Sequence, residues 1–248
     1  MKKLLIFFSA IFIFSSEIFA QADTIHAKNN KLLLSNLHEG RVEYLVYNTD
    51  SLFNRKNNGD IWERRTSFVT FHDMPAVKFE WNWFHNDSLS ANIINYCDRN
   101  TFAPVFHKAV YKKRGTMAYD FRDGKMIPSD TIADNAASKR APVNMDIPVI
   151  SWEQDLETYP LLPVKKIGQK FEISFFDPNE KAPTYHLYEV TGKEDLQISA
   201  DVKVKCWLLK IDYSKDSYAI FWLSEKSKEV LKMKEYFRGS YRFKVRLY

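Results

Sequence analysis

The sequence predicts a mainly β protein, built as a single curved antiparallel sheet or half-open β-barrel of about 10–12 strands. Apolar and polar residues alternate over most of the chain after residue 40, which is typical of strands with one buried face. The 248 residues include 19 Phe, 13 Tyr and 6 Trp but only seven glycines, a composition that favours strands. One segment, residues 150–171, changes to helical spacing, so we expect one short helix, about 151–159, on the concave face.

The first 20 residues, MKKLLIFFSAIFIFSSEIFA, have the features of a secretory signal peptide. Lys2 and Lys3 precede an apolar run from 4 to 14, and Ala20 is a small residue at a plausible cleavage point. The run is short for a membrane-spanning helix, which needs about 20 apolar residues, so an uncleaved anchor is the less favoured alternative. No later segment is apolar enough to cross a bilayer. We therefore expect an exported protein, in the periplasm, associated with the outer membrane, or secreted.

Residues 21–40 form a lead-in whose structure the sequence does not define, and residues 41–248 are expected to form a single β-rich domain. Twelve segments read as strands: 41–48, 60–73, 77–85, 88–98, 103–113, 115–127, 169–177, 183–192, 201–214, 217–224, 229–237 and 241–248. Most are joined by short polar turns, which favours antiparallel pairing, and a sheet of this length curls because strand twist accumulates. A long loop at 128–148 would be the boundary in an alternative with two small β units.

The expected helix starts after Ser151, which with Gln154 fits a Ser-x-x-Gln capping box, and it ends at Pro160. Its apolar positions are Trp152, Leu156 and Tyr159. Its acidic residues are interpreted as solvated charges near the helix start, where they suit the helix dipole. A helix of this length does not persist alone in water, so it must pack on an apolar surface.

No motif in the sequence indicates an enzyme, a metal site or a cofactor site. The six histidines form no His-x-x-x-His pair, and neither a Gly-x-Ser-x-Gly turn nor a phosphate-binding glycine loop is present. The net charge of +5 is spread along the chain rather than clustered, which disfavours nucleic-acid binding. We therefore expect a non-catalytic protein without cofactor or metal.

Two functional hypotheses remain, and they differ in what the helix covers. In the first, sheet and helix enclose a lipid or another apolar ligand, because such pockets are mostly lined by apolar and aromatic side chains. The candidate lining residues are Trp81, Trp83, Trp152, Leu156, Tyr159, Leu161, Leu162 and Trp222. In the second, these side chains fill a solid core, and the protein is a structural or protein-interaction module of the cell envelope.

The last strand and the two cysteines bear on partners and on covalent structure. In the last strand Arg242, Lys244 and Arg246 alternate with apolar residues, and this basic face is a candidate partner surface in the second hypothesis. Cys97 and Cys206 both lie in strand-like segments. Export would permit a disulfide between them, but buried free thiols are common in such surroundings and are the favoured alternative.

Several segments resemble exported bacterial proteins of the domain-of-unknown-function family 3108: NYCDRNTFAPVFHKAVYKKRGTMAYDF, PLLPVKKIGQKF, YEVTGKEDL, KCWLLKI and FWLSEKSKEVLKMK. The similarity covers about residues 41–248, with one departure, Ala200 in place of the family's glycine before the cysteine-bearing strand. The resemblance implies no assigned activity and no catalytic residues. It implies a shape similar to the curled sheet of outer-membrane lipoprotein-sorting carriers, which shelter acyl chains against a short helix.

Overall fold

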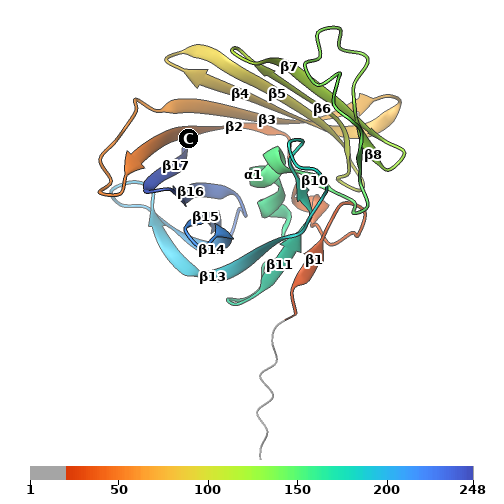
Figure 1. Cartoon of the computed structure of the whole chain (residues 1–248). Helices are drawn as coiled ribbons and strands as arrows, with labels where there is room; N and C mark the ends of the chain where they lie inside the picture. The colour runs from red at the N-terminus through yellow and green to blue at the C-terminus, as the bar shows by residue number, and fades with distance from the viewer. Residues whose placement is uncertain (1–20, 248) are drawn as a thin grey trace, which may run out of the picture.

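The computed structural model describes residues 21–247, in which a large curved sheet wraps around one short helix (Figure 1). The sheet has 15 strands in the order β1-β11-β13-β14-β15-β16-β17-β2-β3-β4-β5-β6-β7-β8-β9. The predicted mainly β fold, with a curved antiparallel sheet and a single short helix, is confirmed. The predicted signal peptide, residues 1–20, lies outside the described residues.

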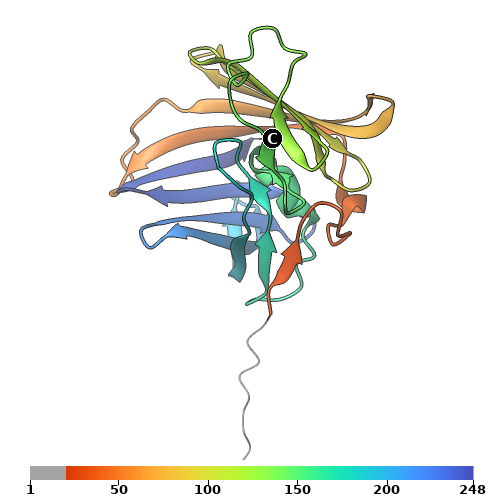
Figure 2. The same ribbon diagram turned by 45° about the vertical axis from the view of Figure 1, so that its right-hand side comes forward.

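The sheet curls into two facing walls, as Figures 1 and 2 show. The first wall contains β2 (Gly40–Asp50), β3 (Asp60–Phe71), β4 (Met74–His85), β5 (Ser88–Asp98), β6 (Pro104–Tyr111), β7 (Gly115–Arg122), β8 (Lys125–Pro128) and β9 (Val143–Asn144). The second contains β1 (Asp23–Ile25), β11 (Lys170–Ile173), β13 (His186–Gln197), β14 (Lys203–Ser214), β15 (Ser217–Ser224), β16 (Val230–Phe237) and β17 (Ser240–Leu247). The walls join where β17, the last strand, pairs antiparallel with β2, from Ser240 opposite Asp50 to Leu247 opposite Glu43.

The opposite side of the half-barrel is bridged by a second, small sheet. There β10 (Ile150–Ser151) and β12 (Phe175–Phe176) pair in parallel, on either side of the helix in the sequence. The Ile150 N–H also donates to the Ser174 carbonyl at 3.0 Å. The two edges of the large sheet, β1 and β9, do not pair with each other, so the barrel is not closed. The chain from β9 to β12, which includes the helix, connects the two walls on this side.

The lead-in is part of this sheet. Strand β1 pairs in parallel with β11, from Asp23 opposite Phe171 to Ile25 opposite Ile173, and a 3₁₀ turn, η1 (Leu34–Asn36), follows. Ile25 is fully buried. Parallel pairing needs residues far apart in the sequence, and a three-residue strand carries little pattern, which is why the sequence left this segment undefined.

Ten of the twelve predicted strands correspond to single strands, and two are divided. The segment predicted at 115–127 is the hairpin β7–β8, which turns at Asp123-Gly124, where both residues have positive φ angles (+53° and +68°). Asp-Gly is a preferred pair for such two-residue turns. The segment at 169–177 is interrupted at buried Ser174, between β11 and β12.

The main core lies between the two walls, and the helix fills its centre. Inward-facing residues of β2, β4, β13, β14 and β15 pack with the helical segment in one cluster that includes Phe79, Tyr159, Phe171, Tyr188 and Phe221. The Tyr159 ring lies 4.6 Å from that of Phe221, and its hydroxyl donates to the Tyr188 hydroxyl at 3.1 Å. The space under the apolar face of the helix is therefore packed with side chains.

The helical segment consists of three short parts: η2 (Trp152–Gln154), α1 (Asp155–Thr158) and η3 (Tyr159–Leu161). Its position agrees with the prediction, but the predicted capping box is wrong. The Ser151 hydroxyl donates to Glu153 Oε2 at 2.9 Å, and Gln154 donates to Cys97 Sγ at 2.9 Å instead of returning to the helix start. Contacts with the walls, rather than a cap, hold this segment in place.

Candidate functional site

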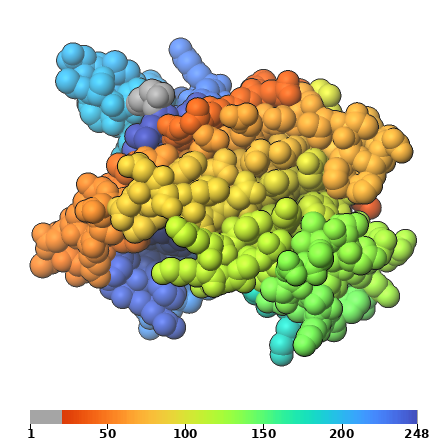
Figure 3. Space-filling view, turned by 90° about the horizontal axis from the view of Figure 1, so that it is seen from above, coloured from red at the N-terminus to blue at the C-terminus, as the bar shows by residue number. Residues whose placement is uncertain are grey.

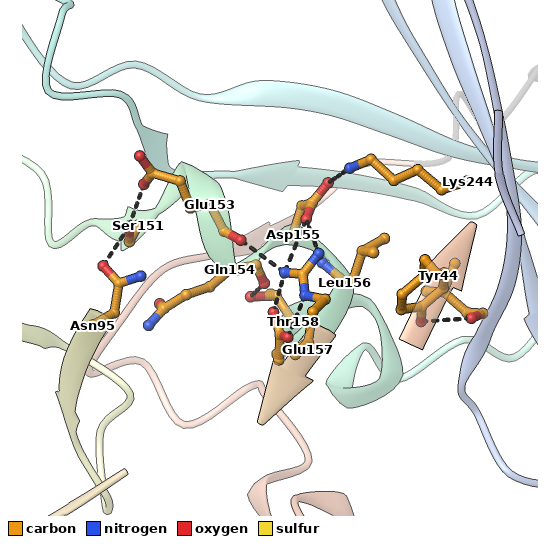
Figure 4. Close-up of polar contacts among 12 residues, drawn as sticks. Tyr44, Asn95, Ser151, Glu153, Gln154, Asp155, Leu156, Glu157, Thr158 and Lys244 are labelled. Carbon is orange, nitrogen blue, oxygen red and sulfur yellow. Dashed lines mark hydrogen bonds and ion pairs between the residues drawn. The ribbon is translucent and has the colours of Figure 1, made fainter. Parts of the chain in front are cut away.

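The acidic residues of the helix are paired with cations inside the half-barrel, so the prediction that they are solvated is wrong. Arg64, on β3, is only 2% exposed, and its Nε donates to Glu157 Oε1 at 2.6 Å. Its Nη2 donates to the Glu153 carbonyl at 2.8 Å, and Nη1 lies 3.4 Å from Asp155 Oδ1. Figure 4 shows Asp155 and Glu157 on this side of the helix, and the Glu153 carboxylate directed toward Ser151.

The surroundings keep Arg64 charged. Burial alone would lower its pKa, but Glu157 and Asp155 raise the pKa above its usual value. The guanidinium also lies 3.7 Å from the centre of the Trp81 ring, where a weakly hydrated cation is favourable. Arg64 thus connects β3, β4 and the helix through a fork of donors that a lysine could not reproduce.

A second inward-facing cation, Lys244 on β17, approaches the helix from the other wall. It is 5% exposed, and its Nζ lies 3.6 Å from Asp155 Oδ2 (Figure 4). The same Nζ lies 4.9 Å from the centre of the Trp62 ring. Burial lowers the pKa of Lys244 to about 8, against an attraction to Asp155 that favours the charged form. Two cations, Arg64 and Lys244, therefore face two carboxylates, Asp155 and Glu157, and the buried group is electrically balanced.

The basic face of the last strand is therefore turned inward, contrary to the prediction of a partner surface. Lys244 is buried, while Arg242 forms an ion pair with Glu235 and Arg246 forms one with Glu229, each at 2.6 Å. The apolar residues of this strand face outward instead. Phe243, for example, stacks on Tyr47 at 5.1 Å.

A separate polar group lies at the start of the helix. His107 Nδ1 lies 2.8 Å from Asn95 Oδ1, and the Ser151 hydroxyl donates to the same oxygen at 3.3 Å. His107, Asn95 and Ser151 are all buried. Ser151 and His107 thus share Asn95 as a partner and do not form the nucleophile–base contact of a hydrolase. This group fixes the turn into the helix against β5 and β6.

Three adjoining cavities lie at the end of the half-barrel where β14 turns into β15 and β16 into β17. The middle one, of about 270 Å³, is lined by Trp152, Tyr213, Phe237, Arg242 and Lys244, with Asp155 and Glu235. A cavity of about 490 Å³ shares Trp152 and Tyr213 with it, and one of about 380 Å³ shares Phe237 and Arg242. We call these three adjoining hollows the mouth groove.

A separate cavity, of about 310 Å³, lies at the opposite end of the helix, and we call it the second cavity. Its lining includes Tyr44, Arg64, Glu157, Leu161 and Arg246. The helical segment contributes Trp152 and Asp155 to the mouth groove, and Leu156, Glu157, Pro160 and Leu161 to this second cavity. The helix and its buried ion pairs therefore separate the two cavities.

The structure separates the predicted ligand-lining residues into four sets. Leu156, Tyr159, Leu161 and Leu162 belong to the packed core, and only Trp152 lines the mouth groove. Trp81 and Trp83 face inward on β4, where Trp81 lies under Arg64 and Trp83 stacks on Trp62 at 4.3 Å. Trp222 is on the outer face of β15, in a small cluster with Cys206 and Leu231. The prediction that it faces the helix is therefore wrong.

The sequence reasoning missed most of the groove. Tyr213 and Phe237 come from strand ends, where alternation no longer shows which way a side chain points, while Arg242 was predicted to lie on an exposed basic face. Lys244 was predicted on an exposed basic face and Arg64 was not singled out, because buried cations are rare unless paired. The sequence indicated these buried cations only indirectly. Because the helix has to be buried, its three acidic residues require cations on the surrounding strands.

The two cysteines are free and buried, on strands in opposite walls, with Cys97 facing the core and Cys206 the outer face. Burial raises the pKa of the Cys97 thiol to about 12 and that of Cys206 to about 11.

Within residues 21–247 no group of three or more His, Cys, Asp or Glu side chains is arranged to hold a metal ion. No helix in this range is long and apolar enough to span a bilayer.

The family model described as Protein of unknown function (DUF3108) matches residues 45–246. The chain belongs to this family. The resemblance seen in the sequence is thereby confirmed over nearly all of the β domain. No protein of curated function matches the sequence.

Two solved structures are similar to this DUF3108 protein. A β-barrel-like protein of domain of unknown function DUF1849 from Brucella abortus has a TM-score of 0.53 and 11% identity, covering 84% of this chain and 94% of that chain. This likeness shows a shared fold only. A putative lipoprotein from Parabacteroides distasonis ATCC 8503 has 10% identity over 84% of this chain and 94% of that chain, but a TM-score of 0.28, which is too low to compare folds.

Replacing Arg64 tests the buried ion pairs. We expect Arg64→Met to lower the free energy of unfolding by about 3–5 kcal/mol, because it leaves the Glu157 carboxylate buried without a cation and Asp155 with Lys244 alone. Arg65→Met is the matched control, since Arg65 is exposed on the opposite face of the same strand. Urea denaturation measures both. Equal losses in the two variants would contradict the structural role of Arg64.

The lowered pKa of Lys244 predicts a specific pH dependence. In the folded state this amine loses its proton near pH 8, against 10.5 for the free group. Between these two pH values the unfolded chain binds more protons than the folded protein, so the free energy of unfolding rises with pH. The cost of burying charged Lys244 is therefore fully present below about pH 8 and disappears toward pH 10.5. Relative to Lys244→Met, the protein should gain about 1–3 kcal/mol over this range in urea denaturation. A difference that does not change with pH would show that the amine is not buried.

Proposed function

We propose that this protein is an exported, non-catalytic binding protein of the bacterial cell envelope that holds an amphiphilic ligand in the mouth groove. The ligand would be a lipid or a similar molecule with an apolar part and an acidic group. The observation that carries this proposal is the composition of the groove, where aromatic walls meet two cations from one strand.

The aromatic walls suit an apolar chain. Trp152 and Tyr213 separate two of the cavities, with ring centres 6.1 Å apart, and Tyr213 and Phe237 are 39% and 52% exposed. Large exposed aromatic side chains that border a hollow favour contact with an apolar ligand over contact with water. The individual cavities, of about 270–490 Å³, are in the range of small-molecule sites.

The cations suit an acidic group. Arg242 is 41% exposed and forms an ion pair with Glu235 through Nε, so the rest of its guanidinium faces the groove. Lys244 is 3.6 Å from Asp155, longer than a hydrogen bond, so its ammonium has donors to offer. A carboxylate or phosphate that entered between Arg242 and Lys244 would gain two charge-assisted contacts in a partly desolvated site.

The packed core places the ligand at the mouth instead of beneath the helix. The apolar face of the helix contacts the side chains of the main cluster directly, as Tyr159 does with Phe221. A ligand under the helix would have to displace these contacts, at a cost that tightly packed interiors make large. The groove requires no such rearrangement.

The same packed core favours a second candidate function, a structural or protein-interaction module of the envelope. The helix is fixed by buried ion pairs, and inner residues of both walls pack with it in the main cluster. A partner would contact side-chain surfaces rather than add a strand, because the sheet edges β1 and β9 are only three and two residues long.

Native mass spectrometry of the protein purified from the envelope fraction distinguishes the two candidates. We expect a bound amphiphile that Arg242→Ala loses and Arg246→Ala retains, since Arg246 is on the same face of β17 but lines the second cavity. An added long-chain fatty acid should also raise the unfolding temperature, because binding to the folded state contributes about 2.7 kcal/mol at a hundred times Kd.

The ligand-binding proposal fails if no amphiphile copurifies and no fatty acid raises the unfolding temperature of the wild type. Equal loss of ligand in Arg242→Ala and Arg246→Ala would also contradict binding in the mouth groove. Either result would leave the packed interaction module as the better supported function.

A further inference from the structure

The rim beside the mouth groove combines exposed apolar tips with cations. Leu52 is 79% exposed, the highest value among the large apolar side chains of residues 21–247, and the neighbouring Phe53 is 56% exposed. Both belong to the loop between β2 and β3. Phe237, at the turn between β16 and β17, is 52% exposed. Exposed large apolar residues that gather at loop tips indicate a surface that contacts something other than water.

These tips lie side by side. The Phe53 ring stacks on Tyr241 at 4.8 Å, and Lys56 Nζ donates to the Ser240 hydroxyl at 2.9 Å, which places the loop against the β16–β17 turn. Figure 3 shows the loop (orange) and the C-terminal strands (blue) projecting at the same end of the molecule. We call this surface the basic–aromatic rim; it comprises Leu52, Phe53, Arg55, Lys56, Lys234, Phe237, Arg238 and Tyr241.

The cations of the rim are placed on or beside its aromatic rings. Lys234 Nζ lies 4.6 Å from the centre of the Tyr241 ring and 5.2 Å from that of Phe53. The Arg238 guanidinium lies 4.9 Å from the Phe237 ring. With Arg55 and Lys56 the rim carries four cations interleaved with three apolar tips, against one carboxylate, Asp50, at the base of the loop. The surface therefore has a positive charge that matches an anionic partner.

The loop that carries the tips is held in an exposed conformation. Asp50 Oδ1 accepts the backbone N–H groups of Leu52 and Asn54, each at 2.9 Å, and Asp50 Oδ2 accepts the Asn54 amide at 3.0 Å. Phe53 has a positive φ of +65°, which is unfavourable for a bulky residue and requires such support. The apolar tips are thus preorganised to point outward, and the hydrogen bonds from Asn54 lower the pKa of Asp50, whose single negative charge is outnumbered by the four cations of the rim.

We propose that the basic–aromatic rim docks onto an anionic phospholipid bilayer, with Leu52, Phe53 and Phe237 entering the interface and the cations contacting headgroup phosphates. Aromatic and aliphatic side chains are favoured at the headgroup level, and lysine and arginine next to them gain from the negative surface potential. Phe237 and Tyr241 also line the mouth groove, so docking would bring the groove to the membrane surface. The proposal does not depend on a ligand in the groove.

Vesicle co-sedimentation of the protein purified from the envelope fraction tests the rim. We expect binding to vesicles that contain phosphatidylglycerol and little to vesicles of phosphatidylcholine alone. A tip variant, Leu52→Ser with Phe53→Asn, should bind at least roughly tenfold more weakly, because asparagine tolerates the positive φ while the apolar tips are removed. A charge variant, Lys234→Gln with Arg238→Gln, should bind roughly tenfold more weakly and lose most of the salt dependence.

The matched control replaces a cluster of similar composition elsewhere, Lys165→Gln, Lys166→Gln and Ile167→Ser, whose side chains are also exposed. This control should bind as the wild type does, and thermal unfolding confirms that all variants are folded. Absence of binding to anionic vesicles, or an equal loss in the control, overturns the proposal. If the charge variant weakens binding but the tip variant does not, the rim attracts anions without entering a bilayer, which also overturns it. None of the substituted residues lines the mouth groove, so loss of membrane binding is distinguishable from loss of ligand binding.

Discussion

The buried pairing of Arg64 with the helix is the interaction on which the rest of the structure depends. The helical segment has no side-chain cap, spans only residues 152–161 and is not stable alone. The walls, in turn, would enclose an unfilled interior without it, since Leu156, Tyr159 and Leu161 belong to their common core. Arg64 joins the two by holding Glu157 and the Glu153 carbonyl against β3, while its guanidinium covers Trp81.

This arrangement determines where the protein can bind something else. Because the interior around the helix is packed and electrically balanced, the space that remains lies at the two ends of the half-barrel, with the helix between them. At one end, the last strand brings Arg242 and Lys244 next to Trp152 and Tyr213. The mouth groove and the basic–aromatic rim meet at Phe237 and Tyr241, so a membrane and an amphiphilic ligand would be encountered on the same side of the molecule.

Much of the fold could be predicted from sequence, because alternation reports one buried face per strand. Strands β5 and β15 were predicted with their observed limits. Which face of a strand points inward was harder to predict where both faces are covered. In β17, Lys244 points inward because it pairs with Asp155, while Phe243 packs on Tyr47 on the outer face. Trp222 was misplaced for the same reason. The capping box failed because Ser151 and Gln154 found partners on β5, contacts that no local pattern contains.

Native-state hydrogen exchange in Arg64→Met, compared with Arg65→Met, tests most directly whether Arg64 holds the helix in the sheet. The amides of residues 155–161 should lose more protection in Arg64→Met than those of β4 and β5, because the helix would be released from walls that remain paired until global unfolding. Helix amides that stay as protected in Arg64→Met as in Arg65→Met would contradict this role, and would show that apolar packing alone keeps the helix in place.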